Sequence, residues 1–112
     1  MSGPEIRLLK ILNLQVTQPD LERKRLEFLA EKTCQNLPEV WKLNNKNIIA
    51  DGHHRIKNAV NSGKEKIKVN YHCQKNTKIR KEAYLYLTEE IEQRAQSCQQ
   101  KGIYNISDMC IK

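Results

Sequence analysis

The spacing of apolar residues predicts a strand and then a helix in the first third of the chain. Residues 6–14, IRLLKILNL, are rich in leucine and isoleucine and predict a strand, although a short helix also fits so brief a run. Residues 20–35 predict a helix in which Asp20 is the N-cap and Glu22 lies in the first turn. Helical periodicity predicts that this helix buries a stripe of Leu21, Phe28 and Leu29, with Leu26 beside it.

Pro38 precedes two short apolar runs, EVWKL and NIIAD, which predict a hairpin with asparagines in its turn. The spacing of Ile56, Ala59 and Val60 then predicts a helix, and Ser62-Gly63 is a suitable stop for it. In KIKVNY (66–71) lysine alternates with apolar residues, which predicts a half-buried strand. The order β-α-β-β-α-β over the first 71 residues indicates an α+β or small α/β fold.

Residues 81–87, KEAYLYL, fit two interpretations. Alternation predicts a strand with Tyr84 and Tyr86 on one face, followed by a helix that Thr88 caps and Gly102 closes. A single helix from Thr77 to Lys101 fits equally well. The last ten residues, IYNISDMCIK, are expected either to dock or to fray. A chain of 112 residues is expected to form one domain over 1–112, with a core at about 6–72 and a C-terminal helical extension at about 77–112.

Composition restricts the compartment and the kind of core. Hydrophobic residues make up 38% of the chain and aromatic residues 5%, so the core must be mainly aliphatic. No run approaches the roughly 18 apolar residues of a membrane helix, and the N-terminus lacks the apolar segment of a signal peptide. We therefore expect a soluble, cytoplasmic protein without a membrane partner. The cysteines form no CxxC pair, which argues against a zinc ribbon or a redox dithiol.

The positive charge is concentrated in the middle of the chain. Residues 38–81 hold eleven Lys and Arg against three Asp and Glu, whereas the whole chain has a net charge of +7. The positive electrostatic field of such a segment favours polyanions, either the nucleic-acid backbone or nucleotide phosphates. A solvated, lysine-rich surface is the alternative. The nucleic-acid-binding candidates are Lys64, Lys66, Lys68, Lys75, Lys78, Arg80 and Lys81.

The stretch IIADGHHRIKN (48–58) carries the main candidate chemistry. If Asp51-Gly52 ends a strand and His53 begins a helix, the free amides of the helix start form an anion site. Gly52 would allow a phosphate to approach closely, and Arg55 would add a bidentate contact. His53 and His54 could donate hydrogen bonds or act as general acid or base. Asp51 could hold Mg²⁺ or accept a proton from an attacking hydroxyl or water.

Two other interpretations of this stretch stay open. Asp51 could simply cap the helix beside solvated histidines, as in many Asp-Gly turns. A metal could also be bound by His53 and His54 with His72 or Cys73. Adjacent histidines diverge by about 100° on a regular helix, however, which disfavours this metal site.

The segment NIIADGHHRIKNAVNSGKEKIKVNY resembles the ParB/sulfiredoxin superfamily, in which an apolar strand, a D-G-H-H-R-like turn, a helix, a glycine and a closing strand follow one another. LQVTQPDLERKRLEFLAEKT and LPEVWKLN resemble the preceding parts of that fold more loosely, so the resemblance covers about residues 6–72. It implies a ParB/sulfiredoxin-like fold, with a mixed sheet and flanking helices, that binds nucleotide phosphates at the turn.

The branches of the superfamily differ at this turn. Sulfiredoxins resemble it as G-C-H-R, but His53 stands where their catalytic cysteine stands, so sulfinic-acid reduction is not expected. The CTP-binding partition branch, G-E-R-R, matches Gly52 and Arg55. The free serine kinase branch is similar throughout D-G-H-H-R. It implies Asp51 beside the substrate hydroxyl, histidines and arginine on the phosphates of ADP or ATP, and an acidic residue that reads the substrate amine, for which Glu22 is the candidate.

The resemblance therefore favours a nucleotide- or phosphate-binding ParB-like domain. Such a domain would be DNA-associated and could hydrolyse nucleoside triphosphates or act as a nuclease. Against the nuclease, the sequence has no dense carboxylate cluster for two metals. The ligand would be ATP, ADP or CTP, with Mg²⁺ if the site is catalytic. The alternatives are a small-molecule kinase, a non-enzymatic nucleic-acid-binding module and a degenerate copy of the fold that serves only in protein interaction.

Overall fold

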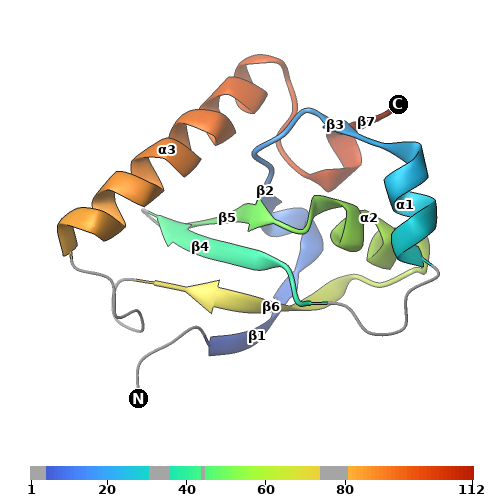
Figure 1. Ribbon diagram of the computed structural model, residues 1–112, viewed down its shortest axis with the longest axis horizontal. Coiled ribbons are helices and arrows are strands. Elements are labelled where there is room, and N and C mark those ends of the chain that lie inside the picture. Colours follow the sequence, from blue (N-terminus) through green and yellow to red (C-terminus); the bar gives the residue numbers. More distant parts are fainter. Residues whose placement is uncertain (1–4, 31–35, 44, 74–80) are drawn as a thin grey trace.

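The computed structural model describes residues 5–30, 36–43, 45–73 and 81–112 (Figure 1). Within these residues the chain combines a five-stranded mixed sheet with three α-helices, as the expected α+β class requires. In chain order the elements are β1 (Glu5–Lys10), η1 (Ile11–Asn13), β2 (Leu14–Gln15), β3 (Asp20–Leu21), α1 (Arg23–Ala30), β4 (Glu39–Leu43), β5 (Lys46–Asp51), α2 (His53–Asn61), β6 (Lys66–His72), α3 (Lys81–Gln100), η2 (Ile106–Asp108) and β7 (Cys110–Ile111).

The large sheet has the strand order β1-β6-β4-β5-β2. β1 is antiparallel to β6 and β4 is antiparallel to β5, whereas β4 and β6, like β2 and β5, are parallel. The predicted hairpin is β4–β5, and Asn45 in its turn has a φ of 65°, a conformation that asparagine tolerates better than most residues. A 3-10 turn, η1, divides the strand predicted over 6–14 into β1 and β2.

One face of the sheet carries the main aliphatic core. Val40, Ile49 and Val69 are buried there in the same cluster as Ile56 and Ala59 of α2. Ile106 of η2 also belongs to this cluster. The predicted apolar stripe of α2 is thus confirmed, because the residues at i and i+3 face the sheet.

α3 covers part of the opposite face. Ile48 is buried, and because it neighbours Ile49 on β5 it points to the other side of the sheet. The Tyr84 hydroxyl of α3 donates a hydrogen bond to the carbonyl of Lys42, with 2.8 Å between the oxygens. Over β1 and β6 this face is open, since Leu8 and Lys68 lie directly opposite each other and are both exposed.

The first helix differs from its prediction. α1 begins at Arg23, because Asp20 and Leu21 form β3 and pair in parallel with β7. Asp20 is therefore not the N-cap; its Oδ2 lies 3.0 Å from Nζ of Lys112. Glu22 lies just before the helix instead of in its first turn, and its carbonyl accepts the first helical bond, from the amide of Leu26. Residues 31–35 of the predicted helix lie outside the described residues.

The predicted buried stripe of this helix is also partly wrong. Phe28 is 58% exposed, whereas Leu26 is buried and Leu29 is half-buried. The side of α1 that faces α2 carries Leu26, whose carbonyl accepts a hydrogen bond from Nδ2 of Asn58 over 3.0 Å. Sequence spacing alone did not determine this rotation of the helix.

α3 is one continuous helix from Lys81 to Gln100, so the alternative of a strand over 81–87 is wrong. Thr88 is not a helix cap either. Its hydroxyl lies in the middle of α3, where it is buried and donates to the carbonyl of Tyr84. The first residues of the longer predicted helix, 77–80, lie outside the described part of the chain.

The C-terminal residues dock, as one of the two expectations held. Ile106 is fully buried, and β7 pairs with β3 beside α1 (Figure 1). The amide of Lys112 donates to the carbonyl of Leu21, and the carbonyl of Lys112 accepts from the amide of Arg23. In the described part of the chain, no helix combines the length and the apolar character needed to cross a bilayer.

Candidate functional site

The turn between β5 and α2 depends on Gly52. This residue is the N-cap of α2 and has a φ of 98°, in the region that disfavours side chains. A Cβ built there would lie 2.8 Å from both Cα and Cβ of Pro38. Gly52 is therefore required by its own backbone and by the close approach of the segment that leads into β4.

The start of α2 presents backbone amides without a side-chain cap. The amides of His53, His54 and Arg55 lie in the first turn, where no helical carbonyl precedes them, and Gly52 makes no side-chain cap. The first helical bond inside α2 runs from the amide of Ile56 to the carbonyl of Gly52. This helix end carries a partial positive charge and favours an anion.

Arg55 is held in place from two sides. One guanidinium nitrogen donates to the backbone carbonyl of Asn36, and the other lies 3.7 Å from Oδ2 of Asp51. The side chain of Arg55 is only 17% exposed, whereas that of Asp51 is 69% exposed. Oδ1 of Asp51 accepts a hydrogen bond from the amide of Gly52 over 2.9 Å. A fixed cation and an accessible carboxylate thus lie side by side.

His53 is buried and neutral. Its Nε2 accepts a hydrogen bond from the amide of Thr17 over 3.1 Å, so this nitrogen carries no proton. The Thr17 hydroxyl donates to the carbonyl of Ile49 over 2.7 Å. Burial, with the neighbouring His54, lowers the pKa of His53 to about 4. These contacts attach the segment after β2 to the start of α2.

His54 makes a similar contact one step further along the chain. Its Nε2 accepts from the amide of Glu22 over 2.9 Å, which fixes the residue that precedes α1. Burial and the nearby Arg25 lower the pKa of His54, against the opposing effect of Glu22. The two adjacent histidines therefore both hold residues 17–22 against the first turn of α2.

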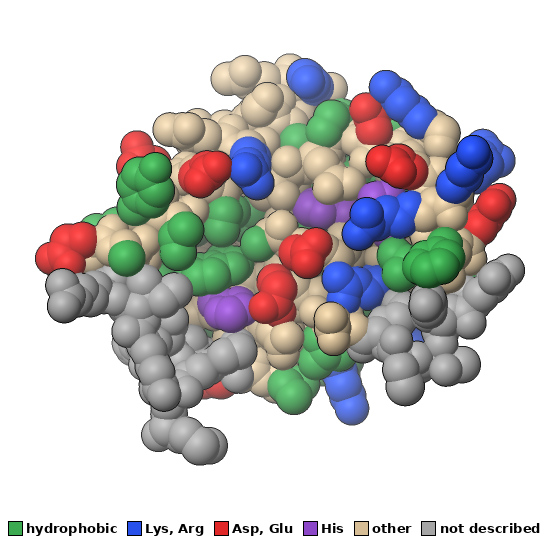
Figure 2. Space-filling view, in the orientation of Figure 1, with side chains coloured by type: hydrophobic (Ala, Val, Ile, Leu, Met, Phe, Trp, Pro, Cys, Tyr) green, Lys and Arg blue, Asp and Glu red, His purple; other side chains and the backbone are tan. Residues whose placement is uncertain are grey.

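These elements surround a polar cleft of about 290 Å³, which we call the α2 cleft. Its described lining residues are Gln18, Glu22, Arg25, Leu29, Asp51, Gly52, His53, His54 and Arg55. Six of the nine, the turn Asp51–Arg55 and Glu22, are site residues expected from the sequence. Gln18, Arg25 and Leu29 were missed, although the i, i+3, i+7 spacing of Glu22, Arg25 and Leu29 on one helical face could have indicated two of them. On the face in Figure 2, histidine surface lies beside basic and acidic side chains.

Three of the predicted basic residues line a second, larger cavity. Lys64, Lys66 and Lys68 lie in an open groove of about 970 Å³, which we call the lysine groove. Arg55 lines both the lysine groove and the α2 cleft. Lys75, Lys78 and Arg80 lie outside the described residues, and Lys81 begins α3.

The third histidine does not join the other two. His72 stacks on Trp41, with 4.5 Å between ring centroids, and its Nε2 lies 3.2 Å from Oε1 of Glu39. No group of three or more His, Cys, Asp or Glu positioned for a metal occurs among the described residues. The alternative of a histidine metal site is therefore not formed by the residues described.

No protein-family model matches the chain, and no curated protein matches its sequence. Among solved structures, the chain is similar to protein Atu1540 from Agrobacterium tumefaciens, with 15% sequence identity and a TM-score of 0.55. The match covers 78% of this chain and 48% of that chain. The chain thus matches about half the length of that protein, and the likeness concerns the fold alone.

Proposed function

We propose that the α2 cleft binds the phosphate groups of a nucleotide, as in a ParB/sulfiredoxin-like domain. The observation that carries the proposal is the uncapped start of α2, which opens into a cleft with Arg25 and Arg55 on its walls. Helix amides and guanidinium groups together are the usual protein ligands of phosphate oxygens. Gly52 adds no side chain in front of these amides.

The size of the cleft supports binding of the phosphates more than of a whole nucleotide. Its volume of about 290 Å³ lies at the lower limit of ordinary small-molecule sites. Leu29 and Arg55 also line the lysine groove, so the nucleoside of ATP, ADP or CTP would extend in that direction. The two histidines serve this site as positioning residues, since their Nε2 atoms already accept backbone hydrogen bonds.

Mg²⁺ fits this cleft as an ion held mainly by the nucleotide. Asp51 offers an exposed carboxylate at the rim, and Mg²⁺ commonly uses one or two carboxylates together with substrate phosphates and water. When bound, the ion would neutralise charge on the phosphates. The protein's own part would be to hold the anion with Arg55 and the helix amides.

Arg55 provides the direct test of binding. In a thermal-shift screen over ATP, ADP and CTP with Mg²⁺, a nucleotide present at 100 times its Kd stabilises the fold by about 2.7 kcal/mol and raises the unfolding midpoint. Arg55→Gln retains an N–H donor for the Asn36 carbonyl but removes the charge, so we expect it to abolish the rise.

Arg94→Gln is the matched control, because Arg94 is exposed on α3, where it pairs with Glu90 and lines none of the three cavities. Its midpoint should rise like that of the unchanged protein. No rise with any nucleotide in the unchanged protein, or an equal rise in the Arg55 variant, would contradict the proposal.

A second candidate function, phosphoryl transfer, rests on Asp51. Its carboxylate is exposed beside the phosphate ligands, where it could take the proton of an acceptor hydroxyl or of water as the terminal phosphoryl group is transferred. Asp51→Asn keeps an oxygen for the amide of Gly52. We expect this variant to abolish turnover in a phosphate-release or radiolabel-transfer assay while its nucleotide affinity stays within about threefold of the original.

If Asp51→Asn lost affinity and turnover equally, the carboxylate would serve binding alone. A wild-type protein that binds nucleotide without turning it over would refute the enzymatic candidate and leave the binding function intact.

A further inference from the structure

We propose that the lysine groove and an adjoining pocket bind single-stranded nucleic acid, with the backbone phosphates on the lysines and a base in the pocket. This inference rests on the proposed function in one respect, because the strand would end with a phosphate at Arg55 in the α2 cleft. The pocket, which we call the base pocket, has a volume of about 430 Å³ and lies away from the α2 cleft. Its lining residues are Lys10, Ile11, Leu12, Asn13, Val60, Lys64, Glu65, Lys66 and Ser107.

The three cavities form one path because they share lining residues. Arg55 belongs to both the α2 cleft and the lysine groove, and Lys64 and Lys66 belong to both the groove and the base pocket. A ligand that follows these shared residues passes from the start of α2 to its end. A mononucleotide in the α2 cleft would occupy only the first part of this path, whereas a polymer could occupy all of it.

The charge of the lysine groove suits a polyanion. The described lining residues of the lysine groove include Arg55, Lys64, Lys66 and Lys68 and no carboxylate. Lys10 lies directly opposite Lys66 in the β1–β6 pair, and like charges in that arrangement destabilise a sheet. Among the described residues, no carboxylate forms an ion pair with any of these lysines. Bound phosphates would relieve this repulsion and release their counterions.

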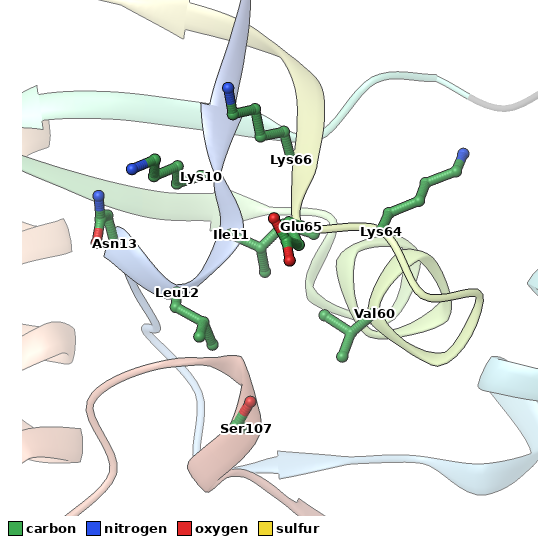
Figure 3. Close-up of a pocket in the computed structure, with 9 residues that line it drawn as sticks. All are labelled: Lys10, Ile11, Leu12, Asn13, Val60, Lys64, Glu65, Lys66 and Ser107. Carbon is green, nitrogen blue, oxygen red and sulfur yellow. The ribbon is translucent and has the colours of Figure 1, made fainter.

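The base pocket suits an unstacked base more than another phosphate. Figure 3 shows Ile11, Leu12 and Val60 around its middle, Ser107 beyond them, and the ammonium groups of Lys10, Lys64 and Lys66 extending outward. Apolar side chains therefore face the interior while the cations face the surroundings. Asn13, Glu65 and Ser107 provide hydrogen-bonding groups for the edge of a base.

This arrangement favours a single strand over a duplex. In a duplex the bases are stacked and paired, and no base can enter a lateral pocket without being extruded. In a single strand the bases are free to turn away from the backbone and to contact apolar side chains. Leu12 is 61% exposed beside the pocket, and an apolar contact of this kind would cover it.

The experiment measures fluorescence anisotropy of a labelled twelve-nucleotide oligothymidylate over a series of salt concentrations. One variant carries Lys64→Gln, Lys66→Gln and Lys68→Gln, and its matched control carries Lys24→Gln, Lys42→Gln and Lys101→Gln, three exposed lysines that line none of the cavities. Both lose the same charge. We expect the groove variant alone to bind about tenfold more weakly or worse, and the slope of log K against log salt to fall by about 2, since each lost phosphate contact changes it by about 0.7.

Leu12→Ala tests the base pocket separately, with Leu85→Ala on α3 as its control. We expect Leu12→Ala to weaken binding by about threefold to tenfold through lost apolar contact, without changing the salt slope. The same variant should have no effect on an oligonucleotide whose sugars carry no bases. Equal losses for the two probes would overturn the assignment of the pocket to a base.

A mononucleotide titration separates this inference from the proposed function. The groove variant should keep most of its mononucleotide affinity, because the phosphates would contact Arg55 and the amides of α2, and only the uncharged nucleoside would lie towards the groove. Three results would show that the inference is wrong while the function of the α2 cleft stands. Oligothymidylate could bind no more tightly than the mononucleotide, the groove variant could bind oligothymidylate like its control, or a duplex of equal length could bind as tightly. If the mononucleotide itself does not bind, the proposed function is wrong, whatever the result with oligothymidylate.

Discussion

At Gly52, a hydrogen atom in place of a side chain lets β5 turn into α2 against Pro38. A methyl group at this position would have two separate costs. The left-handed conformation of a residue with a Cβ costs about 1–2 kcal/mol, and the methyl group would collide with backbone and ring atoms of Pro38 at 2.8 Å. Gly63 allows the two costs to be separated, because its φ of 85° is similar but nothing lies within 4 Å of its added Cβ.

We expect Gly63→Ala to lower the free energy of unfolding by about 1–2 kcal/mol. Gly52→Ala should cost clearly more, by at least about another 1–3 kcal/mol, because Pro38 must move. Urea unfolding of the two variants measures both values. Equal losses would mean that the contact with Pro38 relaxes without cost.

The pKa of His53 makes stability depend on pH with a definite sign. Its folded pKa of about 4 lies below the unfolded value of about 6.5, so the unfolded chain binds the proton more readily. The full contribution of neutral His53 is present above about pH 6.5 and is lost as the pH falls towards 4. By linkage, the fold should lose about 2 kcal/mol between pH 7.5 and pH 5.

Denaturant unfolding at the two pH values measures this loss. His53→Gln retains an acceptor for the amide of Thr17 but does not titrate, and it should show a much smaller loss over the same interval. The pKa of His54 is also lowered, so a small loss in the same direction is expected to persist in the variant. An unchanged loss in His53→Gln would contradict the assignment.

These two residues also mark what sequence could and could not predict at the site. The residue types of Asp51–Arg55 were enough to predict a strand-to-helix turn with an anion-binding end, because helix starts have free amides irrespective of the tertiary fold. The direction of the histidine rings was not predictable, because it depends on the amides of Thr17 and Glu22, more than thirty positions away in the chain.

At the scale of elements, the α2 cleft depends on how α1 packs against α2. The side chain of Asn58 on α2 donates to the carbonyl of Leu26 on α1, and this bond links α2 to the helix that carries Arg25. Without the donor, a partly buried carbonyl of α1 loses its side-chain partner.

We expect Asn58→Ala to lower the free energy of unfolding by about 1–2 kcal/mol. It should also weaken nucleotide binding by about threefold or more, because α1, which carries Arg25, loses a contact that holds it against α2. Asn61→Ala on the same helix, where the residue is exposed, should leave both quantities nearly unchanged. Denaturant unfolding and nucleotide titration of the two variants check this; a binding loss of the same size in both would remove Asn58 from the account.

The elements that sequence predicted well are those with strong local signals. The β4–β5 hairpin, α2 with its stop at Ser62-Gly63, and alternating β6 all follow from turn residues and periodicity. The start of α1 was misplaced because tertiary pairing of β3 with β7 overrides the local preference of Asp20 for a cap. α3 was ambiguous because Tyr84 and Tyr86 fit an alternation, although only Tyr84 is buried.

At the scale of the whole molecule, the sequence was enough to predict the fold class and the basic segment, but not the cavities that these basic residues line. A net excess of basic residues in 38–81 was visible, but the distribution of these residues among the cavities depends on tertiary contacts, among them the β1–β6 pair beside the lysine groove and the base pocket. That pairing also makes Lys10, from the first strand, a neighbour of Lys66. The base pocket itself had no signal in the sequence, since its walls come from the end of β1, η1, the end of α2, the start of β6 with the residues before it, and η2.

The pairing of β3 with β7 affects the order in which parts of the chain fold. Asp20 and Leu21 pair with residues 90 positions further along the chain, so this contact closes a very long loop and is expected to form late in folding. Glu22 follows β3 directly and is one wall of the α2 cleft. During synthesis the sheet and α2 have emerged before β7, so the cleft would acquire its final wall only when the last described strand leaves the ribosome.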